Sequence, residues 1–270
     1  MRILFLILIV LNTGLVSMAQ APRVYREVVD DVHSIFADNE AYSPASLQFS
    51  FSLNNMAFSE KEDKVFVVPP RSKKIKLGEI RRINPTNAYS LNYKFKYNTG
   101  DVTINSKDHS ALYDLPFAKG RSYKIYQGYD GRLSHQNEKS LDFTMPEGTE
   151  IFAAREGVVV KLIESNSESC PSKDCIKYNN ELIIMHPDGT FAAYVHLKQN
   201  GALFNVGDSV KQGDLIAYSG NTGWSTGPHL HFTCYIQTFD VRETLPTKFR
   251  INKGEQAVLL LEGSTYLRDY

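Results

Sequence analysis

The chain has 270 residues, of which 42% are hydrophobic, so it can fill the core of one large domain or of two smaller ones. Its 30 Lys and Arg residues balance its 30 Asp and Glu residues. This balance excludes the basic excess typical of nucleic-acid-binding proteins and the acidic block typical of solvated tails. We therefore expect no nucleic-acid partner.

A short apolar run stands near the start of the chain. Residues 3–11 (ILFLILIVL) follow Met1 and Arg2, and small residues stand at Ser17 and Ala19. This arrangement is typical of a secretory signal peptide. The alternative is a membrane anchor, but the run is shorter than the roughly 20 residues that a span needs. We predict a signal peptide over residues 1–19, export to the periplasm or the extracellular space, and no membrane span in the mature chain.

Residues 20–105 have the pattern of a small β-domain. Residues 47–53 (LQFSFSL) alternate strictly between apolar and polar side chains, as a strand with one buried face does. Three further segments behave similarly and are separated by proline-containing turns, namely residues 64–68, 74–77 and 89–97. Short strands at this spacing predict a β-sandwich. Residues 23–36 have a mixed helical character that predicts no element.

Residues 106–250 are also predicted to be β-structure, followed by a C-terminal extension over residues 251–270. Glycine turns such as Pro187-Asp188-Gly189 divide this region. The predicted strands cover residues 150–160, 181–186, 190–197, 209–218 and 229–235. No long helical pattern is found, so the expected fold class is all-β throughout.

The sharpest chemical signal is the segment His229-Leu230-His231. Residues two apart in a strand point to the same face, so both imidazoles project together. Leu230, Phe232 and Cys234 then point to the opposite face and are expected in the core. Because neutral imidazole is a common metal ligand, this pair is a natural half-site for a metal.

Three further residues could complete such a site. In residues 190–197, alternation predicts that Tyr194 and His196 line a groove while the intervening side chains pack in the core. Asp142 stands between Leu141 and Phe143, whose expected burial leaves the carboxylate on the other face. His135 lies in a polar loop just before it. Histidine and carboxylate ligands with one open position are what a catalytic zinc requires.

Of the three cysteines, Cys170 and Cys175 bracket the polar segment Pro-Ser-Lys-Asp. An exported protein meets an oxidising compartment, so this pair predicts a small local disulfide. A zinc site on these cysteines is disfavoured because no second pair would complete it.

These motifs resemble those of the lysostaphin/LytM-type zinc endopeptidases. The resemblance covers roughly residues 112–240, in the order of the family. The segments that carry it are residues 134–135, 141–143, 146–149, 153–159, 194–197, 206–214, 219–223 and 227–232. It implies a LytM-type antiparallel β catalytic domain over residues 106–250. The interval from His135 to Asp142 is seven residues, whereas the commonest family pattern has four, so we predict a longer loop here.

Carried over to this chain, the resemblance implies that His135, Asp142 and His231 bind one Zn²⁺ per chain. It also implies that His196 and His229 are catalytic without binding the metal. Tyr194 is expected either to assist the oxyanion or to pack with its hydroxyl in solvent. The function implied is that of a secreted endopeptidase. It would hydrolyse peptide bonds in peptidoglycan cross-links, or in another peptide substrate, through zinc-bound water and the two histidines.

Two alternatives come from other functional classes. The first is a non-enzymatic LytM-like module that binds or activates a cell-wall hydrolase. Such modules typically lack ligands, whereas all five positions are filled here. The second is a biotinyl or lipoyl carrier, because residues 207–220 (GDSVKQGDLIAYSG) resemble half of such a barrel. No lysine in a suitable context accompanies that segment, so a shared β-architecture is the better explanation.

Overall fold

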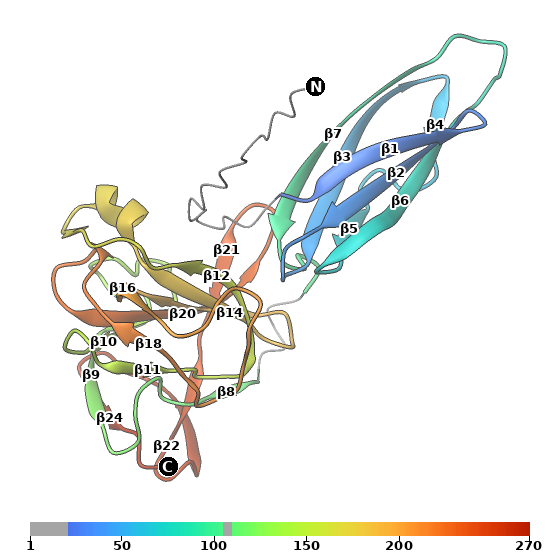
Figure 1. The fold of residues 1–270 in the computed structure, drawn as a ribbon. Coiled ribbons are helices and arrows are strands. Elements are labelled where there is room, and N and C mark those ends of the chain that lie inside the picture. Colours follow the sequence, from blue (N-terminus) through green and yellow to red (C-terminus); the bar gives the residue numbers. More distant parts are fainter. Residues whose placement is uncertain (1–20, 105–109) are drawn as a thin grey trace, which may run out of the picture.

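The computed structural model describes residues 21–104 and 110–270, and within them the chain is almost entirely β-structure, which confirms the predicted fold class (Figure 1). The predicted signal peptide over residues 1–19 lies outside the described residues. None of the helices in the described part of the chain is long and apolar enough to cross a membrane.

The N-terminal part consists of two sheets that share one hydrophobic core. The first sheet has the order β1 (Arg23–Val29), β2 (Val32–Asn39), β6 (Ser72–Arg82) and β4 (Met56–Phe58). The second has the order β5 (Val65–Val68), β3 (Ala45–Asn54) and β7 (Ser90–Thr99). Ile35 and Ala37 of the first sheet meet Leu47 and Phe49 of the second in the core. The alternation of residues 47–53 thus corresponds to a strand with one buried face.

Residues 23–36, for which the sequence predicted no element, form most of a β-hairpin. The two turn residues Asp30 and Asp31 both have left-handed backbone angles, with φ of 48° and 62°. A two-residue turn of this kind matches the twist of the paired strands and usually contains asparagine or glycine. The Asp-Asp turn gave no such signal in the sequence.

The C-terminal part is built around a long sheet. Along this sheet the order is β17, β12, β14, β15, β20, β10, β9 and β24, and β21 also pairs with β20. The strands are β17 (Ser209–Val210), β12 (Gly157–Ile163), β14 (Glu181–Met185), β15 (Phe191–Val195), β20 (His229–Gln237), β10 (Ser140–Thr144), β9 (Ser122–Gln127), β24 (Thr265–Leu267) and β21 (Arg242–Leu245).

Smaller sheets surround this one. They contain β11 (Glu150–Phe152), β18 (Leu215–Ser219) and β16 (Leu197–Ala202); β23 (Gln256–Leu259), β22 (Lys248–Ile251) and β8 (Leu112–Tyr113); and β13 (Ser169–Cys170) with β19 (Gly223–Trp224). A short 3₁₀ helix, η2 (Lys173–Tyr178), is the yellow helical turn in Figure 1.

The last twenty residues continue the same core. The predicted boundary after residue 250 falls inside β22, and β24 pairs with β9 of the long sheet. Phe249 and Leu260 are buried in one cluster with the core side chains of β10 and β20. Residues 251–270 therefore pack as part of this domain in the structure.

The two parts of the chain touch at the hairpin that joins β20 to β21. The side-chain amide of Asn98, near the end of β7, donates a hydrogen bond to the carbonyl of Thr238. The ammonium of Lys96 lies 4.5 Å from the centre of the Phe239 ring. The N-terminal part is thus attached at one end of β20, and His229 begins the other end of this strand.

Candidate active site

Strands β10 and β20 bring a carboxylate and an imidazole together. The two strands are antiparallel neighbours, and their register places Asp142 opposite His231. Their flanking residues Leu141 and Leu230 are fully buried in the core, so Asp142 and His231 project to the other face. The Nδ1 atom of His231 lies 3.0 Å from Oδ1 of Asp142. The faces predicted for these two strands are correct.

His135 reaches the same point from the loop between β9 and β10. Its Nε2 atom is 3.2 Å from Oδ1 of Asp142 and 3.2 Å from Nδ1 of His231. The three side chains each offer one ligand atom, and these atoms all lie within 4.8 Å of one another. The seven-residue interval between His135 and Asp142 therefore still lets the two side chains meet.

Each of these three side chains has a second partner that orients it. Nδ1 of His135 donates to the carbonyl of Gly128 at 3.0 Å, which leaves the lone pair on Nε2. Nε2 of His231 is 2.8 Å from the Thr233 hydroxyl, so Nδ1 is the atom that faces the cluster. Oδ2 of Asp142 accepts a hydrogen bond of 3.0 Å from Gln127, which leaves Oδ1 as the atom that faces the other two side chains. Metal ligands are typically oriented by such outer contacts.

Gln127 contacts both Asp142 and the loop that carries His135. Its Nε2 atom donates to Asp142, while its Oε1 atom accepts the backbone N–H groups of Leu133 and Ser134 at 2.9 and 3.0 Å. The second pair of contacts fixes the loop immediately before His135. One buried side chain thus positions the carboxylate and the loop that carries the histidine.

The charges of the cluster suit a cation. Burial would raise the pKa of Asp142, but hydrogen bonds from His135 and His231 hold it well below its usual range. Burial alone would lower the pKa of His135, and the neighbouring Asp142 outweighs this and raises it. An ionised carboxylate beside two imidazoles, whose facing nitrogens give up any proton when a metal binds, is a donor set that fits zinc.

His196 and His229 lie beside this cluster and are held by turns. Nδ1 of His196 donates to the carbonyl of Thr222 at 2.7 Å, and Nδ1 of His229 donates to that of Gly227 at 2.8 Å. Because a carbonyl only accepts, each Nδ1 carries the proton and each Nε2 keeps its lone pair. The two ring centres are 4.5 Å apart, and Nε2 of His229 is 3.8 Å from Oδ1 of Asp142.

The environment of His196 favours the neutral imidazole. Burial, together with the nearby rings of His229 and His231, lowers the pKa of His196 to about 3. At neutral pH its Nε2 atom is therefore a proton acceptor.

The groove role predicted for Tyr194 is wrong. Tyr194 is fully buried, its ring centre lies 5.2 Å from that of Phe232, and its hydroxyl accepts the N–H of Ala154 at 2.8 Å. The predicted alternation stops at His196, which has a left-handed φ of 63°. This turn sends His196 to the face of His231, whereas Tyr194 stays on the core face. Its hydroxyl is therefore not available to an oxyanion.

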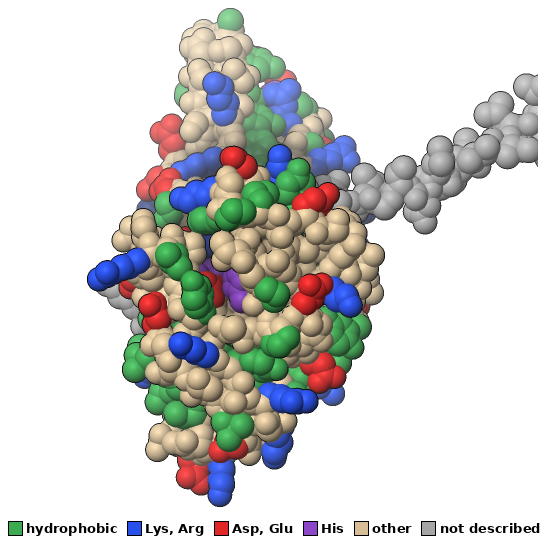
Figure 2. Space-filling view, turned by 90° about the vertical axis from the view of Figure 1, so that its left-hand side faces the viewer, with side chains coloured by type: hydrophobic (Ala, Val, Ile, Leu, Met, Phe, Trp, Pro, Cys, Tyr) green, Lys and Arg blue, Asp and Glu red, His purple; other side chains and the backbone are tan. Residues whose placement is uncertain are grey.

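The site opens to solvent in a hollow of the surface. Figure 2 shows histidine side chains at the floor of this hollow. The side chains of His229 and His231 are 17% and 20% exposed, enough for contact with a ligand. A polar cleft of about 290 Å³ includes Thr222, whose carbonyl holds His196. Its other lining residues are Glu147, Ser167, Ser169, Lys198, Gln199 and Asn221.

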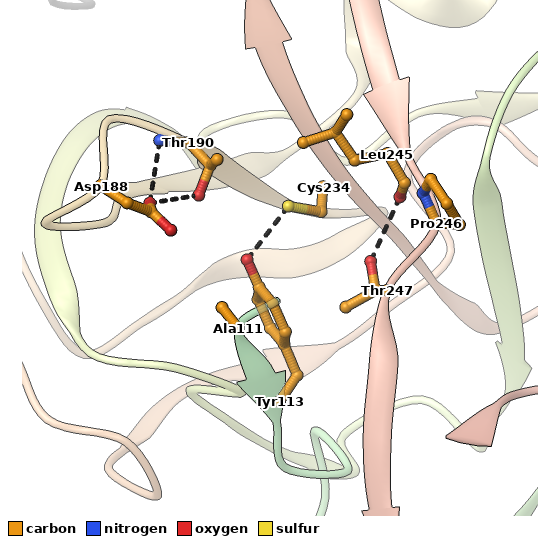
Figure 3. A pocket seen from close by; sticks show the side chains of 8 residues that line it. All are labelled: Ala111, Tyr113, Asp188, Thr190, Cys234, Leu245, Pro246 and Thr247. Carbon is orange, nitrogen blue, oxygen red and sulfur yellow. Dashed lines mark hydrogen bonds between the residues drawn. The ribbon is translucent and has the colours of Figure 1, made fainter. Parts of the chain in front are cut away.

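The three cysteines lie in two places. Cys170 and Cys175 form a disulfide. Cys234 is free and buried on the core face of β20, as predicted, and its sulfur lies 3.1 Å from the Tyr113 hydroxyl. A small second pocket surrounds this contact (Figure 3). It contains none of the five site residues.

The sequence pattern missed several residues that support the site. Thr233 continues the alternation of His229 and His231 on one strand face, and this signal could have found it. Gln127 and Thr222 gave no comparable signal, because their contacts join segments that are distant in the chain.

Part of the chain is similar to known peptidases. Residues 136–242 match the family described as Peptidase family M23. An uncharacterized metalloprotease of Buchnera aphidicola is 38% identical over 164 residues, which are 54% of this chain and 40% of that protein. The peptidoglycan DD-endopeptidase ShyA of Vibrio cholerae is 29% identical over 144 residues, 50% of this chain and 31% of ShyA.

Lysostaphin of Staphylococcus simulans is similar in sequence and has a solved structure. It is 33% identical over 134 residues, which are 49% of this chain and 24% of lysostaphin. Its crystallised catalytic domain aligns with 46% of this chain and 87% of that domain, at 28% identity and a TM-score of 0.34. The chain spans less than half of the length of these three curated relatives.

Proposed function

We propose that this chain, whose residues 136–242 match Peptidase family M23, is a zinc-dependent endopeptidase that cuts peptide cross-links of peptidoglycan. The observation that carries the proposal is the convergence of Nε2 of His135, Oδ1 of Asp142 and Nδ1 of His231. Each of these atoms is left free by a partner that occupies the other polar atom of its side chain.

In this proposal, His135, Asp142 and His231 hold the metal. A zinc ion bound there would supply Lewis-acid chemistry, because it polarises a carbonyl oxygen and lowers the pKa of water. The contact between Gln127 and Asp142 keeps the carboxylate in place, and the hydrogen bonds from His135 and His231 outweigh the effect of burial and keep the carboxylate ionised.

His196 and His229 are the proposed proton carriers. Both have a proton on Nδ1 and a lone pair on Nε2, so Nε2 can take a proton from the attacking water. The same Nε2–H can then donate that proton to the nitrogen of the departing amine as the C–N bond breaks. The hydrogen bonds to Thr222 and Gly227 fix the ring orientation needed for both steps.

The choice of peptidoglycan rests on three supports. One relative carries the name peptidoglycan DD-endopeptidase, and the predicted signal peptide would direct the chain to the cell-wall side of the membrane. The cleft beside His196 is lined by polar side chains, which suits an extended peptide rich in amide groups.

Digestion of isolated peptidoglycan by the mature protein tests the proposal. We expect mass spectrometry to detect products of peptide-bond hydrolysis. A chelator should abolish their release and added zinc should restore it, and the His229→Ala protein should release them at least roughly 10²-fold more slowly. Intact peptidoglycan after treatment with the zinc-loaded protein, or equal release by the His229→Ala protein, would contradict the proposal.

The same experiment separates the enzyme from a non-enzymatic module that activates another hydrolase. Such a module would release products only when the partner hydrolase is added. The presence of all five site side chains favours the enzyme.

A further inference from the structure

The segment over residues 164–180 connects β12 to β14 and is closed by the Cys170–Cys175 disulfide. We refer to it as the disulfide loop. It lies against residues 222–225, the turn that precedes His229 in the chain. This turn matters because it contacts both histidines that are not expected to bind the metal.

The disulfide loop holds this turn first through its backbone. Strand β13 of the loop pairs in parallel with β19 of the turn, with Ser169 opposite Gly223 and Cys170 opposite Trp224. The N–H of Gly223 donates to the carbonyl of Glu168 at 2.7 Å, and the N–H of Ser225 donates to that of Cys170 at 3.2 Å. Cys170 is therefore both a disulfide partner and a backbone partner of the turn.

The far end of the loop contacts the turn through two asparagines. Oδ1 of Asn179 accepts the N–H of Trp224 at 3.0 Å. The N–H of the fully buried Asn180 donates to the Thr222 hydroxyl at 3.2 Å. Gly223 has a left-handed φ of +80°, and a Cβ atom there would lie 1.8 Å from Oδ1 of Asn179. The turn thus fits closely against this end of the loop.

Residues of this turn contact the rings of His196 and His229. The Thr222 carbonyl accepts a hydrogen bond of 2.7 Å from Nδ1 of His196. The Ser225 hydroxyl lies 3.3 Å from Nδ1 of His229. Residue 222 of this turn therefore orients the ring of His196, and Ser225, which also bonds to Gly227, orients the ring of His229 together with the Gly227 carbonyl. The second partners of His135, Asp142 and His231 lie outside this turn.

The disulfide joins the two ends of the loop that hold the turn. Cys170 belongs to β13, and Cys175 belongs to η2, the helix that leads into Asn179. We propose that the Cys170–Cys175 disulfide positions His196 and His229, so that reduction lowers turnover while the metal stays bound. This inference rests on the proposed peptidase function. It links full activity to an oxidising compartment.

The test compares the zinc-loaded mature protein with the Cys170→Ser/Cys175→Ser double variant and with wild type reduced by a phosphine. We expect kcat for peptidoglycan hydrolysis to fall on the order of 10-fold to 100-fold in both, because a displacement of about 1 Å at a catalytic group has an effect of this size. Zinc affinity should stay within about twofold of that of the oxidised protein. The reductant should change nothing further in the double variant.

Trp224, the only tryptophan in the chain, gives a readout that does not depend on activity. Its indole N–H donates to the Pro171 carbonyl of the disulfide loop at 3.1 Å, so its fluorescence should change on reduction. The Asn179→Ala protein, which keeps the disulfide, should also lose turnover. The Ile176→Ala protein is a control within the loop, because that side chain is 49% exposed and should leave turnover unchanged.

The outcomes separate the two proposals. An oxidised wild type that hydrolyses nothing contradicts the peptidase function itself. An active wild type with equal turnover after reduction overturns the role of the disulfide, and the reduced wild type supplies this result even where the double variant does not fold. A loss of zinc affinity as large as the loss of turnover would overturn the claim that the disulfide acts on the two histidines.

Discussion

The three expected metal ligands and the two further histidines meet beside one face of the same sheet, but different parts of the chain hold them. Asp142 and His231 stand opposite each other on paired strands, and side chains such as Gln127 and Thr233 orient the ligand atoms. His196 and His229 are oriented by the backbone carbonyls of Thr222 and Gly227. The register of a sheet thus fixes one half of the site, and contacts among loops fix the other.

The largest effect is expected from substitution of Asp142, which belongs to the metal-binding half of the site (His135, Asp142 and His231). Asp142→Asn keeps the shape but removes the negative charge, so we expect loss of bound zinc and a fall in hydrolysis on the order of 10³-fold or more. Elemental analysis after dialysis and peptidoglycan digestion measure the two effects. Asp130→Asn is the control, since that exposed acid lies before His135 in the same loop and should retain both properties. Bound zinc at the wild-type level in the Asp142→Asn protein would contradict this assignment.

Substitution of His196 or His229 should lower hydrolysis without loss of zinc, which distinguishes these two histidines from the metal-binding half of the site. Each change to alanine should lower hydrolysis by roughly 10²-fold to 10⁴-fold, the usual contribution of general acid–base catalysis. The zinc content should remain at one ion per chain, because neither side chain is an expected ligand. If zinc were lost from either variant, the division between the two halves would fail.

Gln127 tests how much of the metal-binding half depends on residues outside the three ligands. Removal of its amide in Gln127→Ala leaves Oδ2 of Asp142 and the loop before His135 without their partner. We expect zinc affinity to fall by about 10-fold to 100-fold, measured by competition with a chromophoric chelator. Gln136→Ala is the matched control in the same loop, because its amide bonds only to the Arg132 carbonyl. Equal zinc affinities of the Gln127→Ala and Gln136→Ala proteins would contradict the role of Gln127 in metal binding.

The smallest effect concerns His186, a histidine at the end of β14 that does not belong to the site. Burial lowers its pKa to about 4, below the value of about 6.5 in an unfolded chain. The unfolded state therefore binds more protons, and stability present above pH 6.5 is lost as the pH falls toward 4. At pH 5 the loss is about 2 kcal/mol. Denaturant unfolding at pH 7 and pH 5 should show this loss in wild type and a smaller one in the His186→Gln protein. The same pH dependence in both proteins would contradict it.

The sequence predicted correctly which face of the sheet Asp142, His229 and His231 occupy, because the faces of a strand follow from local periodicity. Alternation alone placed Asp142 and the pair His229 and His231 on one face, and it placed Cys234 in the core. It failed at Tyr194 because a single left-handed residue, His196, ends the strand and reverses the faces. The prediction that His196 is catalytic came from the resemblance to the lysostaphin/LytM family and not from the periodicity.

The supporting contacts could not be predicted from local patterns. The Asp-Asp turn between β1 and β2 has no glycine or asparagine, so no turn signal predicted this hairpin. The bond from Gln127 to Asp142 spans 15 residues, and the contact between Asn180 and Thr222 spans 42. Only the folded chain brings such residues together.

The most direct test of the division within the site is a crystal structure of the zinc-loaded protein measured at the zinc absorption edge. The account predicts one anomalous peak per chain, bonded to Nε2 of His135, Oδ1 of Asp142 and Nδ1 of His231 at about 2.0 to 2.2 Å. His196 and His229 should remain unbonded to the metal. A peak bonded to either of these two histidines, or no peak among the three expected ligands, would contradict it.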